Sequence, residues 1–104
     1  DSLIGFAIMN FGDASAHLSL LAVQPSHQRR GIGARMMAWL EESALVAGIT
    51  TINLELRTNN SAARGFYRAL GFRETAHIAG YYQGVETALR MSRDIRRWIS
   101  DRIS

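Results

Sequence analysis

The segment from Val23 to Ala34 holds the residue types that bind a phosphate group. An apolar run ends at Pro25, and the chain continues as Ser26-His27-Gln28-Arg29-Arg30-Gly31-Ile32-Gly33-Ala34. Backbone N–H groups at a glycine turn and at the start of a helix attract anions, and two arginines stand beside them here. The sequence therefore predicts a cradle for a phosphate or pyrophosphate. The alternative is a glycine-rich strand-to-helix turn with solvated arginines, because a Gly-x-Gly pair alone is a weak signal.

The elements that position this segment follow from hydrophobic patterning. Leu3–Phe11 is nearly continuous apolar sequence and predicts a strand buried on both faces. Ala16–Val23 predicts a second strand, and the two strands form a hairpin. From Ile32 onward apolar residues recur every four positions, which predicts an amphipathic helix that ends at Gly48.

The second half of the chain continues with strands and short helices. Three further strands are predicted at Thr50–Arg57, Phe72–Ala79 and Val85–Ser92. Asn60 caps a short helix that ends at Gly71, and Arg93–Ile103 has the pattern of an amphipathic helix. The order predicts an α/β (α+β) fold: a mixed, mostly antiparallel open sheet with one parallel pair, flanked by helices. We expect one domain at residues 1–92, followed by a C-terminal helix at 93–104.

The composition is that of one small globular domain. The chain has 104 residues, no cysteine and a net charge of +3, and arginine supplies every basic side chain. The absence of cysteine excludes disulfides and thiol chemistry, so we expect a reducing, cytoplasmic location. No apolar run is long enough to span a membrane, and the arginines are too scattered for a nucleic-acid surface. His17, His27 and His77 lack metal-ligand spacing, so no metal site is expected.

Two motifs resemble those of the GNAT superfamily of acetyl-CoA-dependent N-acetyltransferases. The first is Gln28-Arg29-Arg30-Gly31-Ile32-Gly33, at the strand-to-helix junction where the family has its acetyl-CoA signature. The second is Asn60-x-x-Ala63-x-x-Phe66-Tyr67-x-x-x-Gly71-Phe72. The ribosomal-protein alanine (protein N-terminal) branch is most similar, through Leu54-Glu55-Leu56-Arg57 before Asn60 and Tyr81-Tyr82 before Glu86, Ala88 and Met91.

The resemblance covers about Leu3–Met91 and implies the GNAT fold without its first strands and helices. A complete member has two more strands and one or two helices before the position of Leu3. We expect that part to be a separate or unobserved segment, or another chain to cover the strand edge that it leaves.

The resemblance also implies acetyl-CoA as co-substrate. Its pyrophosphate is expected over the N–H groups of Arg30–Ala34, with Gln28 and Arg29 as further cofactor-binding residues. Its pantetheine arm is expected beside the strand residues Leu21, Ala22 and Val23. A backbone N–H of the same strand residues is expected to polarise the thioester carbonyl. Asn60 is expected both to contact coenzyme A and to cap its helix.

Glu55 and Tyr67 are the catalytic residues that the resemblance implies. Glu55 lies on the polar face of its strand and is implied as the general base, acting through water. Its alternative is a solvated carboxylate paired with Arg57. Tyr67 is implied as the acid that protonates the coenzyme A thiolate; alternatively, it is a helix aromatic that packs beside Phe66 and Leu70.

The last hairpin and the chemistry of amines bear on the acceptor. Tyr81, Tyr82 and Glu86 are implied to contact it, with ordinary hairpin packing as the alternative. We expect direct transfer to a primary amine in a ternary complex, since no nucleophile is placed for an acyl-enzyme. The resemblance favours a protein or peptide amine. An N-terminal amine is favoured over a lysine, because an α-amine is ~10% neutral near neutral pH and a lysine only ~0.04%. The alternatives are a small-molecule amine acceptor and a non-catalytic acyl-CoA-binding module.

The C-terminal helix is expected to be a docking element or to form a homodimer.

Overall fold

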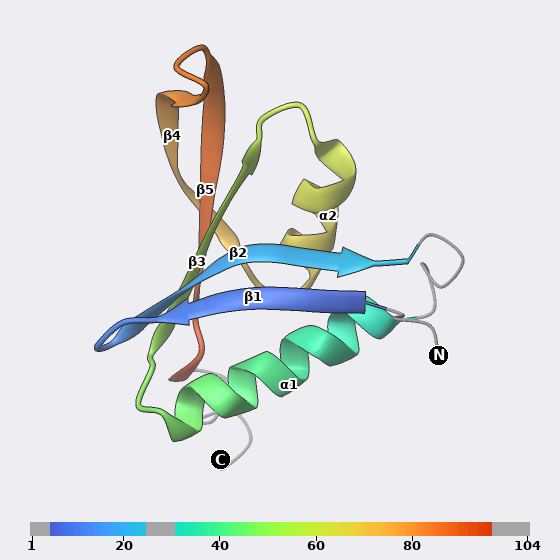
Figure 1. Cartoon of the computed structure of the whole chain (residues 1–104), viewed down its shortest axis with the longest axis vertical. Coiled ribbons are helices and arrows are strands. Elements are labelled where there is room, and N and C mark those ends of the chain that lie inside the picture. The colour runs from blue at the N-terminus through green and yellow to red at the C-terminus, as the bar shows by residue number, and fades with distance from the viewer. Residues whose placement is uncertain (1–4, 25–30, 97–104) are drawn as a thin grey trace. The chain divides into compact units, whose positions relative to one another are not determined.

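The structure is a computed structural model that describes residues 5–24 and 31–96 (Figure 1). The elements of this part of the chain are β1 (Gly5–Phe11), β2 (Ser15–Val23), α1 (Ile32–Val46), β3 (Thr51–Arg57), α2 (Ser61–Ala69), β4 (Arg73–Tyr82) and β5 (Glu86–Asp94). The strands join one sheet in the order β1-β2-β3-β5-β4. The α1 crossover makes the neighbours β2 and β3 parallel, whereas β1–β2 and β4–β5 are antiparallel hairpins. The predicted mixed sheet with one parallel pair is confirmed.

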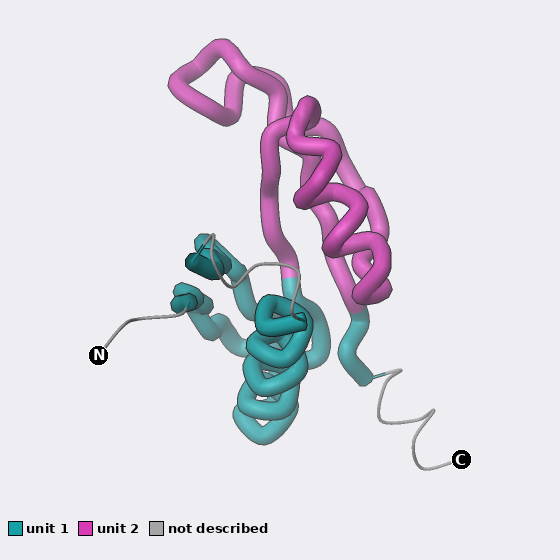
Figure 2. Tube along the Cα trace, turned by 90° about the vertical axis from the view of Figure 1, so that its right-hand side faces the viewer, with its two compact units in different colours: residues 1–52, 94–104 teal, residues 53–93 magenta. Residues whose placement is uncertain are grey.

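The chain divides into two compact units, which Figure 2 distinguishes by colour. The first unit is Asp1–Ile52 with Asp94–Ser104, and the second is Asn53–Arg93. The beginning of β3 therefore belongs to the first unit and the rest of the strand to the second. Fully buried apolar side chains occur in both units, so each has a core of its own.

In the first unit, β1 and β2 form a hairpin against α1. The Gly12 N–H donates to the Ser15 carbonyl at 2.8 Å and closes the turn. The register pairs Gly5 with Val23, and a bulge follows Ile8. The helix lies along both strands (Figure 1). The hairpin therefore presents one of its faces to α1.

The prediction that the first strand is buried on both faces is wrong. Phe6, Ile8 and Phe11 are 44%, 47% and 47% exposed, whereas the residues that alternate with the first two are half-buried. Successive side chains of a strand point to opposite faces. The helix covers the Gly5 side of β1, and the Phe6 side stays exposed. Residues 3–4 of the predicted strand lie outside the described residues.

Helix α1 runs between two glycines, and its predicted extent is confirmed. Gly31 precedes it with a φ of 75° and Gly48 follows it with a φ of 86°, a left-handed conformation that favours glycine. Its buried residues are Met37, Leu40, Glu41 and Ala44. Past the helix, the Thr50 N–H donates to the Ala14 carbonyl at 2.8 Å, and the Ile95 N–H donates to the Thr50 carbonyl at 3.0 Å. Thr50 is thus bonded to the turn of the first hairpin, and Ile95, which follows the second unit in the sequence, is bonded to Thr50.

In the second unit, a capping residue precedes α2, a glycine follows it, and an ion pair joins the helix to β4. The Oδ1 of Asn60 accepts from the Ala63 N–H at 3.2 Å, which confirms the predicted N-cap. Gly71 ends the helix with a φ of 98°. Arg64 holds Glu74 with two bonds, from Nε at 2.6 Å and from Nη2 at 3.0 Å. The core of this unit consists of Leu54, Leu56, Phe72, Ala88, Leu89 and Met91.

The last hairpin differs from its prediction at the turn. The strands predicted to end at Ala79 and to begin at Val85 imply a turn over Gly80–Gly84, and the two glycines of this segment lie in different structures. Gly80 stays within β4, where the register with β5 shifts between Ile78 and Tyr82, as expected for a glycine at an irregular strand position. The turn itself is made by Gln83 and Gly84, with φ of 53° and 75°.

The end of β5 also lies later than predicted. The strand continues through Arg93 and Asp94, the first two residues of the predicted terminal helix. Residues 97–104 of that helix lie outside the described part of the chain. None of the helices within residues 5–24 and 31–96 is long and apolar enough to cross a membrane.

Candidate functional site

The start of α1 is the part of the predicted phosphate cradle that the structure describes. Gly31 has a φ of 75°, and a Cβ built on it would find no atom of the described residues within 4 Å. Within the described residues no side chain caps this helix start, and its first turn contains no acidic residue. The N–H groups at a helix start carry partial positive charge and bind anions. Ile32, Gly33 and Ala34 supply such groups, whereas the predicted Gln28, Arg29 and Arg30 lie outside the described residues.

The predicted pantetheine contacts lie at the carboxyl end of β2. Leu21, Ala22 and Val23 are half-buried. Along one edge they pair with β1, where Val23 faces Gly5. A Cβ on Gly5 would lie 2.7 Å from the Ala22 carbonyl oxygen, so this approach of the two strands requires glycine. The predicted pantetheine arm would have to pair with the edge of this β2 segment that faces away from β1, and this pairing stays a prediction.

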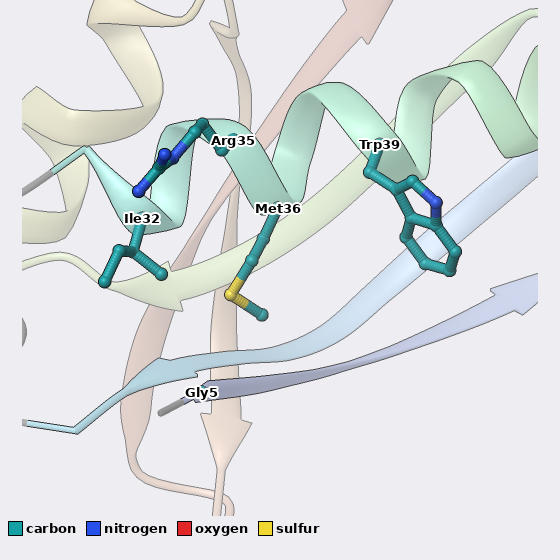
Figure 3. A pocket seen from close by; sticks show the side chains of 5 residues that line it. All are labelled: Gly5, Ile32, Arg35, Met36 and Trp39. Carbon is teal, nitrogen blue, oxygen red and sulfur yellow. The ribbon is translucent and has the colours of Figure 1, made fainter. Parts of the chain in front are cut away.

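A pocket of about 430 Å³ lies between β1 and α1 in the first unit (Figure 3). It is lined by Gly5, Ile32, Arg35, Met36 and Trp39. The figure shows the Met36 and Trp39 side chains reaching from the helix toward the strands. Among the described residues of this lining, Arg35 supplies the one ionisable group. The pocket is a groove of apolar character and is distinct from the predicted catalytic residues.

The side chain of Glu55 is almost fully buried in the second unit, and its partners include residues of β4 and β5. Its side chain is 5% exposed. Arg90 Nε donates to Oε2 at 2.8 Å, and the Tyr81 hydroxyl donates to Oε1 at 3.2 Å. The alternative of a solvated carboxylate paired with Arg57 is wrong. Side chains two apart on one strand lie farther from each other than those facing across a strand pair, so Glu55 pairs across to β5.

Arg57 instead joins the predicted substrate residues. Its Nη1 donates to Glu86 Oε1 at 3.0 Å, and its guanidinium carbon lies 4.5 Å from the centre of the Tyr82 ring. The rings of Tyr81 and Tyr82 meet edge to face, with centroids 4.9 Å apart. The structure therefore brings Tyr81, Tyr82 and Glu86 together, and the bond from Tyr81 connects them to Glu55.

The two tyrosines at this site are harder to ionise than ordinary phenols. Burial raises the pKa of Tyr81 first, and the nearby Glu55 carboxylate raises it further. Burial also raises the pKa of Tyr82, against the opposing effect of the Arg57 charge. Both hydroxyls are therefore protonated at neutral pH and can donate hydrogen bonds.

Tyr67 packs as an aromatic residue of α2 and keeps a hydroxyl that can donate a proton. Its ring meets Phe66 edge to face at 5.1 Å and Phe72 at 5.5 Å. The packing alternative is thus partly confirmed, with Phe72 as the second aromatic neighbour. Burial raises the pKa of Tyr67, so its hydroxyl stays protonated well above neutral pH. Packing of the ring and donation by the hydroxyl use different atoms and do not exclude each other.

Sequence reasoning missed Arg57 and Arg90 as members of the site. The signal lies in alternation: Asn53, Glu55 and Arg57 share one face of β3. The β5 hydroxyl of Ser92 donates to Asn53 Oδ1 at 2.5 Å, two residues from the Arg90–Glu55 bond. Complementary polar residues at every second position of two strands predict this antiparallel register. Among the described residues, no group of three His, Asp or Glu side chains could hold a metal ion.

Comparison with known proteins finds relatives along most of the chain. The sequence profile of the Acetyltransferase (GNAT) family matches residues 1–72. The chain is 37% identical over 95 residues to ribosomal protein bS18-alanine N-acetyltransferase of Salmonella typhimurium (strain LT2), a match that covers 88% of this chain and 64% of that protein.

Solved structures agree with the sequence match. The crystal structure of the ribosomal-protein-S18-alanine N-acetyltransferase from Escherichia coli is similar with a TM-score of 0.78 and 35% identity, over 88% of this chain and 61% of that one. Ard1 from Thermoplasma volcanium is similar with a TM-score of 0.83 and 30% identity, over 89% of this chain and 64% of that one. The chain thus spans less than two thirds of the length of each of these proteins.

Proposed function

Because the chain belongs to the GNAT acetyltransferase family, we propose that it transfers an acetyl group from acetyl-CoA directly to a primary amine of a protein or peptide. The observation that carries the proposal is the start of α1. Gly31 adopts a left-handed conformation there, a Cβ on it would meet no atom of the part of the chain that the structure describes, and no acidic side chain lies in the first turn. A pyrophosphate group fits such a helix start.

The residues of this chain would bind the co-substrate at two places. The N–H groups of Ile32, Gly33 and Ala34 would hold the pyrophosphate, and the β2 residues Leu21–Val23 would align the pantetheine arm. Acetyl-CoA supplies the activated thioester. A backbone N–H of the β2 residues would then donate to the thioester carbonyl oxygen, a contribution of about 3 kcal/mol in comparable oxyanion sites.

The proposed acceptor is the α-amine of a protein N-terminus. The name of the Salmonella relative, an alanine N-acetyltransferase acting on a ribosomal protein, supports this class. The equilibrium of the amine supports it too, because the neutral fraction of an α-amine at neutral pH exceeds that of a lysine about 250-fold. Tyr81, Tyr82 and Glu86 form one cluster, with Tyr82 half-buried and the other two exposed, that could contact a peptide main chain.

Two protons must be handled in the reaction, and the chain offers one group for each. Glu55 would accept the proton that the ammonium loses before it attacks. The Tyr67 hydroxyl, protonated at neutral pH, would donate to the sulfur as it leaves. Family membership supports these roles, and the Tyr67 hydroxyl, whose pKa burial raises, is protonated at neutral pH as an ordinary phenol is.

The proposal is tested by calorimetry and an acceptor panel. Titration with acetyl-CoA should give saturable heat, and an excess of about a hundred times the Kd should raise the free energy of unfolding by about 2.7 kcal/mol. A peptide with a free N-terminal amine should be acetylated, and the same peptide with a blocked N-terminus and one lysine should react about 250-fold more slowly.

Three outcomes would contradict parts of the proposal. Absence of heat with both acetyl-CoA and coenzyme A would overturn all of it. Binding without acetylation of any acceptor would leave an acyl-CoA-binding module. Acetylation of small amines alone would keep the chemistry and overturn the protein acceptor.

A further inference from the structure

The buried position of Glu55 raises the question of how an acceptor amine reaches it. The Glu55 side chain is 5% exposed, whereas Tyr81 is 44% exposed and donates its hydroxyl hydrogen to Glu55 Oε1 at 3.2 Å. The Tyr81 oxygen keeps lone pairs that can accept a hydrogen bond. Tyr81 is therefore the more exposed partner of a carboxylate that is itself almost fully buried, so its hydroxyl can carry a proton toward Glu55.

The other carboxylate oxygen is already engaged. Arg90 Nε donates to Oε2 at 2.8 Å, a charge-assisted bond that fixes the rotation of the carboxylate. With Oε2 facing Arg90, Oε1 is turned toward Tyr81. The two contacts thus define which oxygen receives a proton and from which side.

We propose that Tyr81 is a catalytic proton relay between the acceptor amine and Glu55, and that Arg90 is the positioning residue that aims Glu55 at Tyr81. This inference rests on the proposed acetyl transfer and adds to it a route for the proton. The resemblance implies only an acceptor contact for Tyr81 and no role for Arg90, so both roles come from the contacts with Glu55.

Every proton and electron pair in the proposed relay can be accounted for. The ammonium gives one proton to the Tyr81 oxygen while the Tyr81 hydroxyl proton moves to Glu55 Oε1. The freed nitrogen lone pair forms the new C–N bond, and the C–S bond breaks with its electron pair on sulfur. The nitrogen then loses a second proton. Of these two protons, one passes from Glu55 to solvent and the other ends on the thiol, by way of Tyr67.

The titratable and charged groups of the site come from all three of its strands. Glu55 and Arg57 belong to β3, Tyr82 to β4, and Glu86 and Arg90 to β5. Glu55 raises the pKa of Tyr81 and Arg90 lowers it, with burial as the first cause of its elevation. Opposite effects from the two partners give a test of the contacts that does not depend on turnover.

The first experiment measures the pKa of Tyr81 by its ultraviolet absorbance. The chain has three tyrosines, so the variant with Tyr67→Phe and Tyr82→Phe leaves Tyr81 as the only phenol. In that background Glu55→Gln should lower the pKa of Tyr81, and Arg90→Gln should raise it. A pKa unmoved by both changes would show that the three groups do not meet, and would overturn the relay whether or not the protein turns over.

The second experiment measures turnover of an α-amine peptide with acetyl-CoA. Tyr81→Phe keeps the ring and should lower kcat about a hundredfold at neutral pH, with KM little changed. The deficit should shrink as the pH rises toward the amine pKa of about 8, where the acceptor loses its proton unaided. Arg90→Gln should also lower kcat, and Arg90→Lys should restore part of it. His77→Gln, an exposed residue earlier on β4, is the matched control and should keep wild-type turnover.

The two experiments separate the relay from the proposed function. Wild-type turnover in Tyr81→Phe would overturn the relay and leave acetyl transfer standing. Loss of turnover at all pH values in Tyr81→Phe would also overturn it, because the residue would then be needed for more than proton removal. A wild-type protein without turnover on any amine would overturn the proposed function, and the relay with it, even if the Tyr81 titration behaves as expected.

Discussion

Replacing Tyr67 by phenylalanine should separate packing from chemistry at the proposed acid. The ring meets Phe66 at 5.1 Å and Phe72 at 5.5 Å, both edge to face. Each such pair contributes about 0.5–1.5 kcal/mol, so the two together contribute about 1–3 kcal/mol. Phenylalanine preserves both contacts, and the free energy of unfolding should stay near that of the wild type. Tyr67→Leu should lose about 1–3 kcal/mol.

The turnover of Tyr67→Phe should fall, although its stability should stay near that of the wild type. Burial raises the pKa of Tyr67, so the wild-type hydroxyl carries its proton at neutral pH and can donate to the leaving sulfur. Removal of a positioned acid lowers kcat by about 10²–10⁴, or about 3–5 kcal/mol in the barrier. Tyr67→Phe should therefore be folded, bind acetyl-CoA and turn over slowly.

The assay combines urea unfolding with the rate of thiol release in three proteins: wild type, Tyr67→Phe and Tyr67→Leu. A phenylalanine variant with wild-type turnover would refute the acid role and leave Tyr67 as a packing residue. A phenylalanine variant as unstable as the leucine one would refute the assignment of stability to the ring contacts.

Three other changes test local parts of the structure. Asn60→Ala removes the cap on the Ala63 N–H and should cost about 1 kcal/mol in urea unfolding, with Asn60→Ser restoring most of it. Gly31→Ala places a side chain at a φ of 75° and should cost about 1–2 kcal/mol and weaken acetyl-CoA binding in calorimetry, while Gly31→Asn should be better tolerated in stability. For Glu74, the bond from Arg64 lowers the carboxyl pKa below 4.5, so its stabilising effect is present above that value and lost as the pH falls through the folded pKa. Glu74→Gln should flatten the acid side of the stability profile measured by thermal unfolding, and an unchanged profile would assign the acid sensitivity to other carboxylates.

The parts of the fold with local signals could be predicted from the sequence. Gly48, Gly71 and Asn60 mark helix ends because a left-handed residue or a capping side chain acts within one turn of the chain. The mixed sheet followed from the order of strands and helices, because a single helical crossover requires a parallel pair. These features depend on few neighbours, and the structure agrees with them.

Features that depend on distant neighbours could not be predicted in the same way. Phe6 and Ile8 look like core residues in the sequence, yet burial depends on what covers a strand face, and α1 covers only the other one. Gly80 carries the same turn signal as Gly84, but the pairing with β5 continues past it. Strand pairing decides between a turn and a bulge, and a glycine alone does not specify it.

In the candidate site, too, local features could be predicted and features that depend on distant neighbours could not. Glu55 and Tyr67 were predicted from motif positions, and their places on β3 and α2 agree with the expected elements. The partners of Glu55 were predicted wrongly because Arg57 is closer in sequence, whereas Arg90 is closer in space. The register between β3 and β5 brings Arg90 to Glu55, and only the polar alternation of the two strands signals it.

The most direct measurement is the mass of an α-amine peptide incubated with acetyl-CoA and the protein. The account predicts that the peptide gains one acetyl group on its N-terminal nitrogen with the wild type, and far less with a variant that carries both Glu55→Gln and Tyr67→Phe. Equal acetylation by the wild type and the double variant, or an unmodified peptide with both, would contradict it.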